Sequence, residues 1–164
     1  MRTAVIDSSP LISLTHLGLC SQLTLFFDKV YVPRAVHREV NRKSRFRYRL
    51  KKLYEIGPFE RCIAVDITNV RLLLDEVDEG EAEALAQATE RGAAFFIGDE
   101  KRARVVGKNK GLTPVGTVRI LARLRLEGRA GDTRALVRKL RGDLGFRVSD
   151  AVVRKAIALA AEPI

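Results

Sequence analysis

The chain has 164 residues and a formal net charge of +10, from 30 Lys and Arg against 20 Asp and Glu. This length is enough to bury a core, and 46% hydrophobic residues with only 5 Pro exclude a disordered or low-complexity protein. Only 2 Cys and 2 His are present, which excludes a disulfide framework and a four-ligand zinc cluster. The basic net charge favours nucleic acid as a partner over a purely solubilising role of the charge.

The first forty residues alternate between strand and helix patterns. The apolar run TAVI contains β-branched residues, which is typical of a buried strand. Ser9 before Pro10 indicates a helix start, since a serine hydroxyl caps free N–H groups and proline suits the first turn. We expect a strand at 3–6, a helix from there to Gly18, a helix at 21–27, a strand at 30–32 and a helix opened by Pro33.

Residues 41–52 are strongly basic, with Phe46 and Tyr48 interleaved among the cations. The segment forms either a helix or a mobile arm. Its aromatic residues either stack on nucleic-acid bases or pack beneath the segment. Its seven cations are candidates for nucleic-acid binding: Arg42, Lys43, Arg45, Arg47, Arg49, Lys51 and Lys52.

The remaining chain continues the alternation after a break at Gly57-Pro58. We expect strands at 63–67, 94–97 and 111–115, and helices at 80–91, 99–108, 116–126, 133–140 and 149–161. This order predicts an α/β fold with a mainly parallel sheet. No linker or repeat is evident, so we expect one domain over residues 1–164. No apolar run reaches the ~20 residues of a membrane span, and the N-terminus lacks the apolar segment of a signal peptide. We therefore expect a soluble cytoplasmic protein with no membrane partner.

Four acids occupy positions typical of a site. Asp7 and Asp99 follow predicted strands, and sites in open parallel sheets form beyond the carboxyl ends of strands. Glu81 shares a helix face with the apolar Ala84, Leu85 and Ala88, so it is expected to point inward. Glu83 aligns instead with Gln87 and Glu90, a face expected to be polar and outward. Glu39, the fourth acid, lies between Val36 and Val40 on the helix opened by Pro33.

Each acid alone has an ordinary explanation as a cap, a first-turn charge or a surface ion pair. Together, converging carboxylates repel one another and raise their pKa values. A hard divalent cation such as Mg²⁺ or Mn²⁺, which prefers oxygen ligands, relieves that repulsion.

Four segments resemble, in order and spacing, a PIN-domain protein. They are the segment at 5–18, which begins Val-Ile-Asp-Ser-Ser-Pro, VYVPRAVHREV at 30–40, GEAEALAQA at 80–88 and FFIGDEKRARVVG at 95–107. The chain most resembles the prokaryotic VapC-like branch of toxin ribonucleases. This resemblance lies in the Asp-Ser-Ser-Pro-Leu-Ile run at 7–12 and in the VPxxVxxEV and GExEA patterns. GFRVSDAVVRKAI at 145–157 is similar to the tail of that branch, which implies a C-terminal helical tail over 145–164.

The resemblance implies a three-layer α/β/α sandwich with a central parallel sheet, and an acidic pocket that binds Mg²⁺ or Mn²⁺ and hydrolyses RNA. The family's four acids fall on Asp7, Glu39, Glu81 and Asp99, as catalytic and metal-binding residues. Ser9 and Thr117 match auxiliary positions. The resemblance also implies a toxin-antitoxin pair, with a small antitoxin protein as partner, and a homodimer.

The chain departs from the pattern at one position. Many relatives have two acids after the strand, where this chain has Gly98-Asp99, and this bears on metal affinity and on a second metal site. Two alternatives to a metal-dependent endoribonuclease follow. One is a catalytically degenerate PIN-fold module that binds nucleic acid. The other is an interaction protein whose basic face docks an acidic or antitoxin-like partner.

Overall fold

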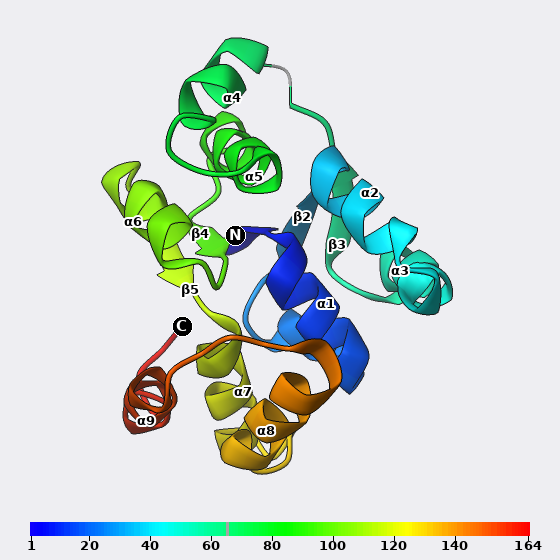
Figure 1. Ribbon diagram of the computed structural model, residues 1–164, viewed down its shortest axis with the longest axis vertical. Coiled ribbons are helices and arrows are strands. Elements are labelled where there is room, and N and C mark those ends of the chain that lie inside the picture. Colours follow the sequence, from blue (N-terminus) through cyan, green and yellow to red (C-terminus); the bar gives the residue numbers. More distant parts are fainter. Residues whose placement is uncertain (65) are drawn as a thin grey trace. The chain divides into compact units, whose positions relative to one another are not determined.

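The computed structural model describes residues 1–64 and 66–164. The chain divides into two compact units, Met1–Val115 and Gly116–Ile164. In the first unit the chain alternates between strands and helices, and the second unit is helical (Figure 1). Among the described residues, no helix combines the length and the apolar character that a membrane span requires.

A five-stranded, fully parallel sheet forms the centre of the first unit. The strands are β1 (Thr3–Ile6), β2 (Lys29–Pro33), β3 (Phe59–Cys62), β4 (Phe95–Ile97) and β5 (Thr113–Val115). Their order is β3-β2-β1-β4-β5, so strands are added on one side of β1 and then on the other. The position between β1 and β4, where the direction of addition reverses, is where open α/β sheets form their sites.

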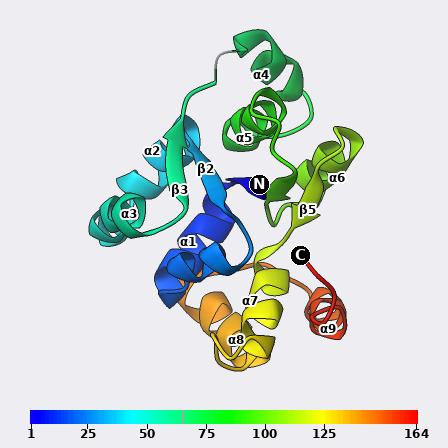
Figure 2. The ribbon, with the colours of Figure 1, turned by 180° about the vertical axis from the view of Figure 1, so that it is seen from behind.

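Helices flank this sheet on both faces, so the first unit is a three-layer α/β/α sandwich (Figures 1 and 2). The helices are α1 (Ser8–Leu17), the 3-10 helix η1 (Cys20–Leu25), α2 (Arg34–Arg42), α3 (Ser44–Ile56), α4 (Ile67–Leu73), α5 (Glu79–Glu90) and α6 (Lys101–Asn109). The expected fold class is therefore confirmed.

Both faces of the sheet are apolar, as covered parallel sheets require. Pairing aligns Val5 with Tyr31 and with Phe96, and these side chains form one core with residues of α4, α5 and α6. On the opposite face Phe27, which follows η1, packs edge-on against Phe95 with ring centroids 5.3 Å apart. All four residues of β1 are buried, which explains the apolar TAVI run.

The predicted strand at 63–67 is wrong. The strand is β3, four residues earlier, where Phe59 pairs with Val30 of β2. Ile63 is 61% exposed, so the apolar run is not a buried strand, and Val65 lies outside the described residues. Helix α4 follows instead and was not predicted. It is capped by Asp66, whose side chain accepts a hydrogen bond from the backbone N–H of Asn69 at 2.9 Å.

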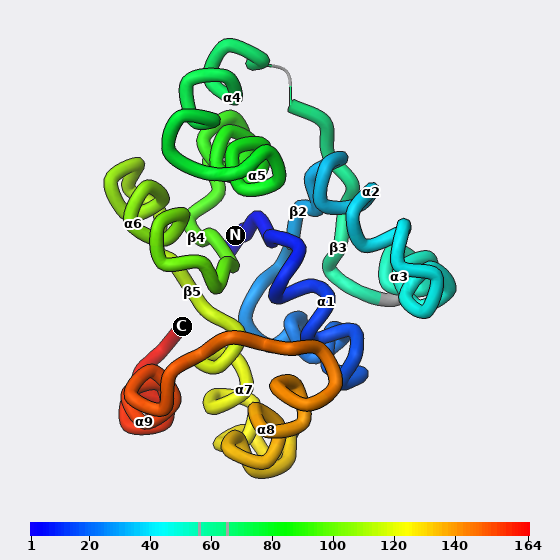
Figure 3. The backbone as a smooth tube through the Cα atoms, in the orientation of Figure 1, coloured from blue at the N-terminus to red at the C-terminus, as the bar shows by residue number. Residues whose placement is uncertain are grey.

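The basic segment is helical, so the mobile-arm interpretation of residues 41–52 is wrong. α3 buries Phe46, Leu50 and Leu53, which recur at helical spacing and form one apolar face. Figure 3 shows α2 leading into α3 through a short bend. The predicted helix at 21–27 is the shorter 3-10 helix η1, and the predicted helix at 99–108 begins two residues later, at Lys101.

The second unit contains α7 (Thr117–Leu126), α8 (Thr133–Leu144) and α9 (Asp150–Ala158). The three predicted helices are confirmed, although α8 extends four residues beyond the prediction and α9 ends earlier. The N-terminus of α8 is capped by Asp132, whose Oδ1 accepts a hydrogen bond from the Ala135 N–H at 3.0 Å. Its C-terminus is capped by Gly145, whose φ of +67° favours glycine.

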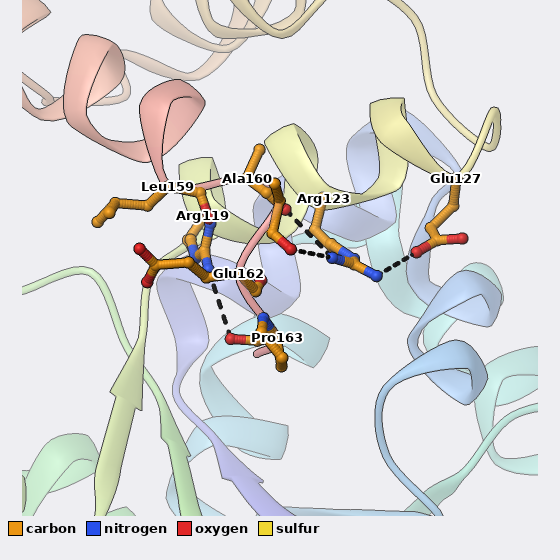
Figure 4. Close-up of polar contacts among 8 residues, drawn as sticks. Arg119, Arg123, Glu127, Leu159, Ala160, Glu162 and Pro163 are labelled. Carbon is orange, nitrogen blue, oxygen red and sulfur yellow. Dashed lines mark hydrogen bonds and ion pairs between the residues drawn. The ribbon is translucent and has the colours of Figure 1, made fainter.

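Two arginines of α7 hold the end of the chain (Figure 4). The guanidinium of Arg119 donates to the carbonyls of Leu159 and, at 2.8 Å, of Glu162. Arg123 donates to the Ala161 carbonyl at 3.0 Å and pairs with Glu127 at 2.6 Å. These carbonyls belong to the residues that follow α9, so the two arginines attach the C-terminal residues to α7.

Candidate functional site

The carboxyl ends of β1 and β4 carry two of the four predicted acids. Asp7 follows β1 directly, and its backbone N–H donates to the Ile97 carbonyl of β4 at 2.9 Å. Asp99 follows β4 after one residue, Gly98. Both acids therefore follow the carboxyl ends of their strands, as the sequence predicted, and the strand order puts these two strands at the reversal point of the sheet.

Asp7 is buried, with 6% of its surface exposed. Among the described residues no cationic side chain forms an ion pair with it. Burial above all raises the pKa of Asp7, a hydrogen bond from the backbone of Ser8 lowers it, and the negative charges of Glu81, Asp78 and Glu39 raise it, which together bring it to about 8. A buried carboxyl among other carboxylates is an arrangement that a cation stabilises.

Ser9 connects the start of α1 to Asp99. Its hydroxyl donates to Oδ2 of Asp99 at 3.1 Å, across 90 residues of sequence. The expected role of this serine as a helix cap is wrong, because Asp7 occupies the N-cap position of α1 and makes no side-chain capping bond there. Asp99 is not the cap of α6 either, since Glu100 occupies that position.

Glu81 lies in the first turn of α5 and is buried, as its helix phase predicted. It forms a reciprocal capping box with Asp78. Oδ1 of Asp78 accepts from the Glu81 N–H at 2.9 Å, and Oε2 of Glu81 accepts from the Asp78 N–H at 3.2 Å. Burial raises the pKa of Glu81 to about 7, and the charge of Asp78 acts in the same direction. Oε1 of Glu81 takes no part in the hydrogen bonds of the capping box.

Asp78 was not predicted as a site residue, although its charge acts on both Asp7 and Glu81. An Asp three residues before Glu is itself a capping-box pattern, and that signal was present in the sequence. A Cβ added at Gly80 would lie 3.5 Å from Oδ1 of Asp78 and 3.8 Å from Oδ1 of Asp7. The Asp7 carboxyl therefore faces the start of α5, where the helix dipole favours negative charge.

The expected outward polar face of α5 is wrong at Glu83 and Gln87, whereas Glu90 is exposed as expected. Gln87 is fully buried, and the Glu83 carboxylate accepts hydrogen bonds from the backbone N–H groups of Arg34 (3.1 Å) and Ala35 (2.9 Å). These groups are the first N–H groups of α2, so Glu83 caps that helix. α5 packs on α2 as well as on the sheet, which buries the face expected to be outward. Glu39, further along α2, is exposed, and its charge raises the pKa of Asp7.

Gly98 has a steric explanation. A Cβ at this position would lie 2.4 Å from the Phe96 ring, which is fully buried. The space that a first acid of a pair would occupy is therefore filled by an aromatic side chain. Glu100 is exposed, and its charge raises the pKa of Glu81.

No three His, Cys, Asp or Glu side chains of residues 1–64 and 66–164 already converge at metal-ligand distances. Asp7, Asp78 and Glu81 form the central acidic group by their mutual electrostatics, Glu39 contributes from α2, and Asp99 is held by Ser9. We call these five acids the acidic cluster. Thr117 begins α7 in the second unit and is not placed relative to the acidic cluster.

The seven cations proposed to bind nucleic acid are all exposed on α2, α3 and the residue between them. Arg49 also has a structural contact, since its guanidinium donates to the carbonyls of Thr15 (3.2 Å) and His16 (3.4 Å) at the end of α1. Phe46 is buried, so it packs beneath the helix. Tyr48 is 68% exposed, with the ammonium of Lys52 4.7 Å from its ring centroid.

Comparison with known proteins gives a family for the chain. A family model described as a PIN domain matches residues 3–162. No curated protein and no solved structure matches the chain. The match covers nearly the whole sequence and agrees with the parallel sheet and its acidic edge. The chain belongs to the PIN-domain family, whose fold is that of nucleases.

Proposed function

We propose that the protein is a metal-dependent endoribonuclease, with Asp7, Glu39, Glu81 and Asp99 as its catalytic and metal-binding residues. One observation carries the proposal: Asp7 is buried at the reversal point of the sheet, surrounded by further carboxylates. Membership of the PIN-domain family supports phosphodiester hydrolysis.

The donor chemistry of the acidic cluster fits Mg²⁺ or Mn²⁺. All its side-chain donors are oxygens, the ligands that hard divalent cations prefer. Mg²⁺ keeps several waters and is often held by one or two carboxylates together with substrate phosphates. A preformed group of three protein ligands is therefore not required. When bound, such a cation lowers the pKa of a water molecule and offsets charge on the phosphate.

The contacts support a proposed task for each residue of the site. Asp7 is the central ligand, Asp78 orients Glu81 through the capping box, and Ser9 orients Asp99. Glu39 adds negative charge from α2. We propose Thr117 as an auxiliary polar residue, and the cations of α2 and α3 as contacts for the RNA backbone.

The motifs in residues 5–18, 30–40 and 80–88 support a narrower proposal. We propose that the protein belongs to the VapC-like branch, acts in the cytoplasm as the toxin of a toxin-antitoxin pair, binds a small antitoxin protein and forms a homodimer. We also propose that residues 1–164 act as one domain, with 145–164 as its C-terminal tail.

A second candidate is a catalytically degenerate module that binds RNA without hydrolysing it. Two observations favour it. The described acids do not form a closed group of three ligands, and Phe96 occupies the space of a side chain at Gly98.

Incubation of end-labelled single-stranded RNA with the protein, in Mn²⁺ and in EDTA, separates the two candidates. We expect internal cleavage products in Mn²⁺ and intact RNA in EDTA, because hydrolysis depends on the cation. RNA that is bound but stays intact in Mn²⁺ would identify the degenerate module.

A further inference from the structure

A groove of about 570 Å³ lies among α2, α3 and β3, in the first unit. Figures 1 and 2 show these three elements beside one another. The volume is within the range of small-ligand sites. Its lining includes the aromatic side chains of His37, Tyr48 and Tyr54 and the cationic side chains of Arg47, Lys51 and Arg61.

The charged lining of the groove is entirely cationic. Arg47 and Lys51 are exposed residues one turn apart on α3, and Arg61 is an exposed residue of β3. None of the described residues that line the groove is an acid. Three cations without a lining carboxylate favour an anionic ligand.

The aromatic lining argues for a ligand with a planar ring. Tyr48 is 68% exposed, a large exposure for an aromatic side chain. Tyr54 is fixed by a hydrogen bond between its hydroxyl and Nδ1 of His37 (2.9 Å). The rings of His37 and Tyr54 lie with their centroids 5.7 Å apart, so the pair forms an aromatic wall of the groove. Bases stack on such side chains with little dependence on sequence.

We propose that this groove binds one nucleotide of a single-stranded RNA, with its base stacked on Tyr48 and its phosphate held by Arg47, Lys51 and Arg61. The inference rests on the proposed function, because it assumes an RNA ligand. A bare phosphate makes no use of the aromatic side chains. The Asp and Glu side chains of an acidic peptide carry no flat ring to stack, and a duplex does not present its bases to a groove of this size.

The groove is separate from the acidic cluster. His37 and Asn41 are one helical turn apart on α2 and face the groove. Glu39 lies between them in sequence, about 200° around the helix axis from His37. An RNA strand must therefore pass over α2 to reach both places. The groove acts as an exosite that positions RNA for cleavage a few nucleotides away.

The test measures binding without cleavage. Fluorescence anisotropy of a labelled ten-nucleotide single-stranded RNA is recorded with the full chain carrying Asp7→Asn, in EDTA. Adding Tyr48→Ala is expected to weaken binding about tenfold, since stacking is lost, whereas Tyr48→Phe keeps the ring and stays within about twofold. Thermal melting confirms that each variant folds.

A matched pair separates the groove from general charge attraction. Lys51→Ala removes a cation of the groove, and Arg45→Ala removes an exposed cation of the same helix that does not line it. We expect Lys51→Ala to weaken binding several times more than Arg45→Ala. Equal losses in the two, or unchanged binding in Tyr48→Ala, overturn the proposal. The proposal is also overturned, in favour of an acidic peptide, if polyglutamate displaces the labelled RNA as effectively as unlabelled RNA does.

The outcomes for the groove and for the enzyme are distinguishable. The binding assay contains no divalent cation and measures no hydrolysis. A wild-type protein that leaves RNA intact in Mn²⁺ refutes the endoribonuclease and leaves the groove supported by its own variants. Unchanged binding in Tyr48→Ala refutes the groove and leaves hydrolysis to be judged by cleavage alone.

Discussion

Asp7→Asn is expected to reduce Mn²⁺-dependent RNA hydrolysis by about 100-fold or more, because it removes the central anionic ligand while keeping the shape of the side chain. The same variant should melt at a higher temperature than the wild type when both are metal-free. The pKa of Asp7 is raised to about 8, so the metal-free wild type at neutral pH folds only by taking up a proton at this carboxyl or by burying its charge beside Glu81 and Asp78, and the amide avoids both costs. A gain of about 2 kcal/mol corresponds to about 5 °C.

Asp75→Asn is the matched control for Asp7→Asn. Asp75 is an exposed acid outside the acidic cluster, and the change removes the same charge from the chain. We expect hydrolysis and melting temperature close to those of the wild type. Hydrolysis by Asp7→Asn at the wild-type rate would remove Asp7 from the catalytic role.

Gly98→Asp, which introduces the second acid found in many relatives, is expected to destabilise the fold by about 3 kcal/mol and to lower the melting temperature by about 10 °C. A Cβ at position 98 would lie 2.4 Å from the ring of Phe96. That ring is fully buried in the core beneath α5, so it has no free space to enter. Thermal unfolding of the purified variant measures the effect.

Two further variants identify the cause of this loss. Gly131→Asp makes the same substitution where no atom lies within 4 Å of the new Cβ, and its melting temperature should change little. Phe96→Leu combined with Gly98→Asp makes room for the new side chain, so the double variant should lose less than the sum of the single losses. A Gly98→Asp protein as stable as the wild type would refute the steric explanation.

The sequence predicted those features that depend on neighbouring residues. The TAVI run, the position of Asp7 after it and the glycine that ends α1 all follow from local pattern and backbone preference. The inward orientation of Glu81 followed from its helix phase, because Ala84, Leu85 and Ala88 mark the buried side. The α/β class followed from the alternation of these elements.

The remaining features depend on tertiary partners. β3 forms at residues 59–62 because these residues pair with β2, whereas Ile63, among the described residues that follow, is 61% exposed and belongs to no strand. Gln87 is buried because α5 contacts α2 in addition to the sheet. The bond from Ser9 to Asp99 joins residues that are 90 positions apart, and no local pattern encodes it.

The central claim is that the acidic cluster holds a divalent cation through Asp7. Calorimetric titration of Mn²⁺ into the metal-free full-length protein tests it most directly, with Asp7→Asn titrated under the same conditions. We predict saturable Mn²⁺ binding to the wild type and none to Asp7→Asn. Absence of binding to the wild type, or equal binding to both proteins, would contradict the claim.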